Sequence, residues 1–157
     1  MYTLSISNKQ NLPEDYQLLY YPYSITEWEI EYKPLPFSKK RKEKIRIVTN
    51  LLRKETAFFE LPFTELKPLS SGGDSIIPQE NYSEDKREEV AQEFIRNYYI
   101  HKKKIWSYPA VNFINSYKLY VPYAIYEDTK QDFVLHELYT DSKEPLTKHK
   151  ELAHYVN

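Results

Sequence analysis

The sequence predicts an α+β fold in which two similar β-units form a mainly antiparallel β-sheet and one long amphipathic helix packs on it. Tyrosine, which favours strands, occurs 16 times among 157 residues, whereas glycine occurs twice. Apolar and acidic residues alternate from Trp28 to Tyr32, as in a strand with one buried face. Residues 83–104 instead repeat their apolar positions with a helical period.

Composition indicates a single globular domain over residues 1–157, because 41% of the residues are hydrophobic and 29% are charged. Cysteine is absent, which excludes disulfides, thiolate metal ligands and a cysteine nucleophile. The formal net charge of -1 argues against nucleic acid and against an anionic membrane as partner. The sequence shows neither a secretion signal nor an apolar run long enough to span a membrane, so we expect a cytoplasmic protein with no membrane contact.

The first β-unit is predicted at about residues 17–66, after a polar segment of sixteen residues that is expected to be a loose arm. It begins with a strand over 18–32 and continues through a basic loop at 33–44. Two apolar runs on either side of the turn at 53–55 then predict a hairpin. A linker is expected at about 67–81, where both glycines lie.

A helix is predicted at about 83–104. Ser83 is suited to the N-cap, acidic residues follow in the first turn, and basic residues fill the last turn, as the helix dipole favours. The expected apolar stripe consists of Val90, Ala91, Phe94, Ile95, Tyr98 and Ile105.

The second β-unit is predicted at about residues 108–157. The sequence predicts a long strand, a turn, the strand "DFVLHELY", a second turn at 140–146, and a tail that forms a short helix or a last strand.

One nine-residue motif occurs in both β-units. "LYYPYSITE" at 19–27 returns as "LYVPYAIYE" at 119–127, with six of nine positions identical. We interpret it as a duplicated strand in which proline causes a bend and the tyrosine rings cover it. Two alternatives stay open: unrelated strands with similar edge chemistry, and a tyrosine platform for a ligand.

The duplication is uneven, because only the second β-unit is preceded by a helix that can cover its sheet. A partner protein, or a second copy of the chain, could cover the first. We therefore expect a non-enzymatic protein-binding module, such as a regulator, inhibitor or immunity-type factor. Aromatic residues on the sheet are its candidate contacts: Tyr20, Tyr23, Trp28, Tyr120 and Tyr123.

The alternative function is binding of single-stranded nucleic acid by tyrosines and basic side chains. The candidate phosphate contacts fall in two clusters, Lys39, Lys40, Arg41 and Lys42 in the basic loop and Lys102, Lys103 and Lys104 at the helix end. A solvated loop and a helix terminus that complements the dipole explain the same clusters without a ligand.

No catalytic residue, metal ligand or cofactor is predicted. The four histidines lack zinc-site spacing, and no nucleophile elbow or glycine-rich phosphate loop occurs. Glu27, Glu29 and Glu31 share one strand face and offer an acid–base site as a third hypothesis, although such rows are more typical of a solvated face.

Overall fold

The computed structural model describes residues 1–4, 12–61, 65–69, 75–153 and 155. They form an α+β fold with a mixed sheet of eight strands and one helical segment of 19 residues. The strands are β1 (Tyr2–Leu4), β2 (Gln17–Tyr32), β3 (Arg41–Asn50), β4 (Glu55–Phe58), β5 (Leu66–Pro68), β6 (Ala110–Glu127), β7 (Phe133–Glu137) and β8 (Ser142–Pro145). The helical segment consists of α1 (Glu84–Asn97) and a π-helical turn, η3 (Tyr98–Lys102).

The chain divides into two compact modules. Module 1 comprises residues 1–23, 61–80 and 118–157, and module 2 comprises 24–60 and 81–117. The long strands β2 and β6 each contribute to both modules. Each module takes segments from both halves of the sequence, and the β-units at 17–66 and 108–157 stay a prediction.

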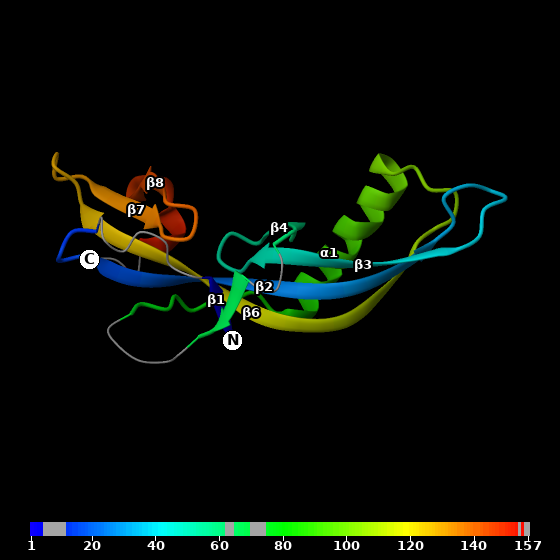
Figure 1. Ribbon diagram of the computed structural model, residues 1–157, viewed down its shortest axis with the longest axis horizontal. Helices are drawn as coiled ribbons and strands as arrows, with labels where there is room; N and C mark the ends of the chain where they lie inside the picture. The colour runs from blue at the N-terminus through cyan, green and yellow to red at the C-terminus, as the bar shows by residue number, and fades with distance from the viewer. Residues whose placement is uncertain (5–11, 62–64, 70–74, 154, 156–157) are drawn as a thin grey trace. The chain divides into compact units, whose positions relative to one another are not determined.

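Module 2 places its strands in the order β4, β3, β2, β6, with α1 packed on them (Figure 1). The expected hairpin is present, and β3 pairs antiparallel with β4 from Ile47–Phe58 to Asn50–Glu55. The predicted alternation in β2 is also seen, because Trp28, Ile30 and Tyr32 are buried. These side chains form a core with Ile47, Ala91, Ile95, Tyr99 and Val111.

The helix begins as its sequence predicts, because the Ser83 side chain accepts a hydrogen bond from the Lys86 backbone N–H. Its buried face is centred one position beyond the expected stripe, on Arg87, Ala91, Ile95 and Tyr99, which follow a four-residue spacing. Phe94 and Tyr98 flank this face and pack on Phe58, with ring centroids 5.1 and 4.6 Å away.

Module 1 contains two strands that sequence reasoning missed. Tyr2–Leu4, expected in a loose arm, forms β1, which pairs parallel with β6 and antiparallel with β5. Ser142–Pro145, expected in a turn, forms β8, which pairs antiparallel with β7. Both strands are short, and β8 is fully exposed, so neither carries the alternating apolar pattern that identifies longer strands.

The tail is helical, which is one of the two predictions made for it, whereas the linker includes part of a strand. The tail forms two 3₁₀ turns, η4 (Leu146–Lys148) and η5 (Lys150–Leu152), and Leu152 docks in the core of module 1. The linker at 67–81 includes the end of β5, and its residues 70–74, with both glycines, lie outside the described residues.

Both copies of the nine-residue motif lie in strands. Pro22 in β2 and Pro122 in β6 are both buried, and neither interrupts its strand. In module 1 the tyrosines of the two motifs form an aromatic cluster. The centroid of the Tyr21 ring lies 5.3 Å from that of Tyr23 and 5.7 Å from that of Tyr123. The tyrosines therefore pack against one another beside the prolines, and the duplication of two β-units stays a prediction.

Candidate functional site

The structure does not place the expected protein-binding residues on one open surface. Trp28 is 2% exposed and Tyr120 is 6% exposed, so both belong to the core. The Trp28 indole N–H donates to Thr26 Oγ1 at 2.8 Å, which satisfies its polar atom inside the protein. Tyr20, Tyr23 and Tyr123 are half-buried. Two of the five candidates therefore cannot present a ring to a partner in this conformation.

The three most exposed rings of module 2 lie on loops instead. Phe37 is fully exposed, Tyr108 is 72% exposed and Trp106 is 64% exposed, and Leu35 is exposed beside Phe37. Sequence reasoning missed these residues because they fall outside the periodic segments. Their signal in the sequence is the presence of large apolar side chains next to prolines, in "KPLPFS" and "IWSYP".

These two loops are joined by three hydrogen bonds around Lys33. The Lys33 backbone N–H donates to Ser107 Oγ at 2.7 Å. The Lys33 carbonyl oxygen accepts from the backbone N–H groups of Trp106 at 2.9 Å and Ser107 at 3.3 Å. The β2–β3 loop and the segment after the helix therefore lie side by side (Figure 1).

A second connection, the Glu43 cluster, ties β2, β3 and the helix end together. It consists of Tyr32, Glu43, Tyr99 and Lys103. The Glu43 carboxylate accepts hydrogen bonds from the Tyr32 hydroxyl and, at 3.1 Å, from the Tyr99 hydroxyl. Lys103 Nζ donates to the two Glu43 oxygens at 3.0 and 3.3 Å. The same ammonium lies 5.6 Å from the Tyr32 ring centroid and 5.0 Å from that of Tyr99.

This arrangement shifts the pKa of each member. Burial alone would raise the pKa of Glu43, but hydrogen bonds from Tyr32 and Lys103 lower it below the ordinary value. Burial and the neighbouring Glu43 carboxylate raise the pKa of Tyr32 and of Tyr99. Burial opposes the charge of Lys103, but its contacts with Glu43 raise its pKa. The cluster is therefore a fixed ion pair with two neutral phenols at neutral pH.

The seven basic candidates fall into two groups. Lys103 belongs to the Glu43 cluster, and Lys40 lies 3.7 Å from Glu31 in an exposed ion pair. The others are exposed and form no ion pair with any described residue: Lys39, Arg41, Lys42, Lys102 and Lys104. We call these five, together with Leu35, Phe37, Trp106 and Tyr108, the aromatic–basic surface.

Charge is distributed unevenly between the modules. The sequence of module 2 contains 15 lysines and arginines against 11 aspartates and glutamates, a formal charge of +4. The sequence of module 1 contains 7 against 12, a formal charge of -5. Residues 33–44 and 102–104 alone carry nine basic side chains and one acidic side chain, Glu43. The near-neutral total therefore conceals a strongly basic patch.

The glutamate row has the contacts of a partly solvated face. Glu27, Glu29 and Glu31 are each half-buried. Glu27 accepts a hydrogen bond from the Tyr117 hydroxyl at 2.8 Å, and Glu31 pairs with Lys40.

Among the described residues, no group of three or more His, Asp or Glu side chains could hold a metal ion. No helix in the described part of the chain is long and apolar enough to cross a membrane.

Comparisons with protein-family models, with curated proteins and with solved structures found no match to this chain.

Proposed function

We propose that this chain is a non-enzymatic protein that binds single-stranded nucleic acid through the aromatic–basic surface. One observation carries the proposal: the exposed rings of Phe37 and Trp106 each lie two residues from a lysine that forms no ion pair with any described residue, on two loops that hydrogen bonds join. Rings that stack with bases, next to cations that contact phosphates, are the components of single-strand binding surfaces.

Two features favour nucleic acid over a protein partner at this surface. Lysine is depleted in protein interfaces, whereas four of the five unpaired basic residues here are lysines. The overall charge of -1 argues against nucleic acid only if the charge is spread evenly, and module 2 is basic.

The Glu43 cluster gives the surface its geometry. By pairing with Lys103, Glu43 fixes the helix end next to β3, while Lys102 and Lys104 on either side stay exposed. Lys33 joins the Phe37 loop to the Trp106 loop through the backbone, which leaves side chains available to a ligand. We expect each stacked base to contribute about 1–3 kcal/mol and each phosphate contact to add a salt-dependent share.

Fluorescence anisotropy with a labelled oligothymidylate tests the proposal. We expect binding at low salt that weakens as salt rises, with a slope of about -0.7 per phosphate contacted. Trp106→Ala should weaken binding by ~1–3 kcal/mol at constant salt. Lys39→Gln with Lys42→Gln should reduce the salt slope. Lys130→Gln, an exposed lysine of module 1, is the matched control and should change neither.

Three results would contradict nucleic-acid binding at this surface. They are absence of binding at low salt, binding that does not respond to salt, and equal affinity of wild type and Trp106→Ala. Circular dichroism of each variant, compared with the wild type, shows that a loss of affinity is not a loss of fold.

A protein partner with an acidic surface is the second candidate, and the exposure of Leu35 favours it. Leu35 is 66% exposed next to Phe37 in a loop with prolines at both 34 and 36. An aliphatic side chain has no ring with which to stack on a base, but it fits an apolar pocket of another protein. A photocrosslinker placed at position 37 should then capture the same protein in repeated experiments. Leu35→Ala should abolish that capture, whereas Ile77→Ala, an exposed apolar residue of module 1, should not.

A further inference from the structure

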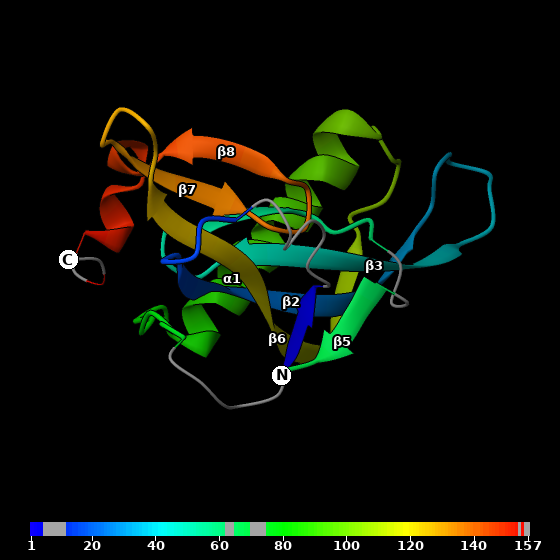
Figure 2. The ribbon, with the colours of Figure 1, turned by 60° about the vertical axis from the view of Figure 1, so that its left-hand side comes forward.

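Module 1 contains a cavity of about 1050 Å³. Its lining residues come from the end of β6, the β6–β7 turn, β7, β8 and the 3₁₀ turns of the tail. Figure 2 shows the course of these segments. Apolar side chains provide much of its lining: Tyr126, Phe133, Val134, Leu146 and Leu152. Ligand sites typically enclose about 300–1000 Å³ with apolar walls and a few polar groups, so this cavity has the size and the lining of a small-molecule site.

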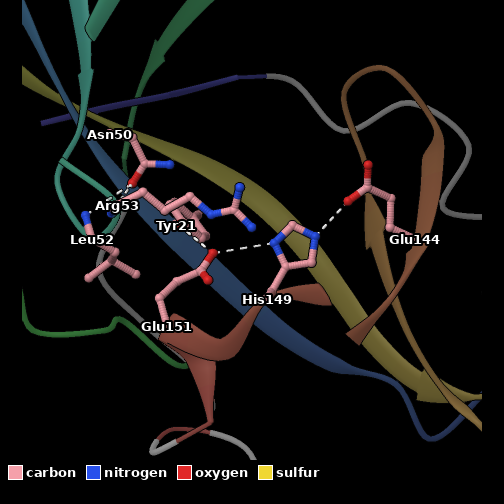
Figure 3. A network of polar contacts seen from close by, with 7 residues as sticks. All are labelled: Tyr21, Asn50, Leu52, Arg53, Glu144, His149 and Glu151. Carbon is pink, nitrogen blue, oxygen red and sulfur yellow. Dashed lines mark hydrogen bonds and ion pairs between the residues drawn. The ribbon is translucent and has the colours of Figure 1, made fainter. Parts of the chain in front are cut away.

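A polar network holds one wall of the cavity in place. His149, which is 14% exposed, contacts two carboxylates, with Nε2 2.6 Å from Glu144 Oε2 and Nδ1 3.3 Å from Glu151 Oε1 (Figure 3). The Tyr21 hydroxyl also donates to Glu151 Oε1 at 2.8 Å. These contacts tie the tail to β8 and β2, and Leu152 is fully buried beside them. The wall is therefore formed before any ligand arrives, which lowers the entropic cost of binding.

The lining contains two lysines and three carboxylates, so the preference for an anion depends on which of these groups have partners and not on their summed charge. Lys143 and Lys150 line the cavity and form no ion pair or hydrogen bond through their side chains with any described residue. The Glu144 carboxylate contacts His149. Asp128 Oδ1 accepts hydrogen bonds from the backbone N–H groups of Lys130 and Asp132. The two lysines are thus the cations of the lining that have no partner among the residues that the structure describes.

Asp132 is the third carboxylate of the lining. The pairing of β8 with β7 places Lys143 several residues along the strand from Asp132. Lys143 pairs with His136 on β7. His136 is four residues beyond Asp132, which corresponds to roughly 13 Å along an extended strand. An anionic group held at Lys143 therefore lies away from the repulsive field of Asp132.

We propose that this cavity binds a small amphipathic organic anion. Its apolar body would lie against Phe133, Val134 and Leu146, and its carboxylate, sulfonate or phosphate group would pair with Lys143 and Lys150. All lining residues of the cavity belong to module 1, whereas the aromatic–basic surface consists of residues of module 2.

Titration with 8-anilinonaphthalene-1-sulfonate, a fluorescent aromatic sulfonate, tests the proposal on the full chain. We expect saturable binding to one site, and competition by decanoate would show that a carboxylate occupies the same place. Lys143→Gln with Lys150→Gln should raise the Kd about tenfold or more. Lys130→Gln, in the adjacent turn but outside the lining, should leave the Kd unchanged. Ala153→Phe, which places a large ring on the lining of the cavity while both lysines stay, should weaken binding.

Four results would overturn the proposal. They are absence of saturable binding, equal Kd values for the Lys143→Gln/Lys150→Gln variant and Lys130→Gln, failure of decanoate to compete, and unchanged binding by Ala153→Phe. If Ala153→Phe binds the dye as the wild type does, the dye binds elsewhere on the protein. Near-ultraviolet circular dichroism must match the wild type in each variant, because the dye also binds partly unfolded chains.

Discussion

Lys103 Nζ lies 3.0 Å from Glu43 Oε1, and this ion pair joins the end of the helical segment to strand β3. The π-helical turn ends at Lys102, so its geometry sets where Lys103 emerges. Single π-helical turns within helices are frequent at functional sites. Because Lys102 and Lys104 adjoin this pair and stay exposed, the ion pair also positions part of the aromatic–basic surface.

Glu43→Gln should destabilise the protein by about 1 kcal/mol at pH 7, because the amide keeps an acceptor for the phenols but leaves Lys103 without a carboxylate. The pKa of Glu43 is lowered, so its stabilising contribution is present above the ordinary glutamate value of about 4.3. It is lost as pH falls through the lower folded-state value. Urea unfolding at pH 7 and at about pH 3 measures both effects.

Glu55→Gln is the matched control for this acid dependence, because Glu55 is exposed on β4. Wild type and Glu55→Gln should lose stability in parallel as pH falls, while Glu43→Gln should lose less. Identical acid dependence in all three would show that the Glu43 ion pair contributes nothing measurable.

Alkaline pH should destabilise the protein through its buried phenols. Burial raises the pKa of Tyr123 and, with the help of the Glu43 carboxylate, raises the pKa of Tyr32 and Tyr99. Folding stability is therefore full below the ordinary tyrosine value of about 10 and falls as pH rises above it, because the unfolded chain releases these protons first. Absorbance at 295 nm should show one group of tyrosines that ionises near pH 10 and another that ionises later, together with unfolding. A single ionisation step in a chain that stays folded would contradict this.

Local sequence signals predicted the elements that contain enough residues to show a period. The alternation from Trp28 to Tyr32 predicted a strand. Ser83, followed by Glu84 and Asp85, predicted the start of a helix. Both patterns depend only on residues that are neighbours in the chain. Strands β1 and β8 depend instead on pairing with distant segments and have only three and four residues. Their short sequences carry no signal of the partner that holds them.

The candidate site shows a similar limit. Sequence reasoning identified the basic residues, because charge clusters are visible without a fold. The alternation in β2 indicates that Trp28 lies on a buried face, but nothing in the sequence indicates that Trp106 is exposed, because residues 105–108 show no period. Which ring is covered depends on Phe113 and the helix packing onto β2, and that is a property of the tertiary structure.

The N-cap of the helix offers a separate test of stability. Ser83→Ala should cost about 1 kcal/mol, because the Lys86 backbone N–H loses its acceptor at 3.3 Å. Ser83→Asp keeps a capping oxygen and places a negative charge at the helix N-terminus, so it should match the wild type or exceed it. Chemical denaturation of the three proteins measures the difference. Equal loss in both variants would mean that the hydroxyl, and not capping, is required.

The two tryptophans should respond in opposite ways to substitution and to quenching. Trp28→Ala should destabilise the protein by about 3–5 kcal/mol, because a buried indole leaves a cavity and Thr26 loses its hydrogen-bond donor. Trp106→Ala should change stability by no more than about 0.5 kcal/mol, because the ring is 64% exposed. In Trp106→Phe, the remaining Trp28 should emit at short wavelength and resist iodide. Strong iodide quenching in that variant would place Trp28 at the surface and return it to the set of candidate contact residues.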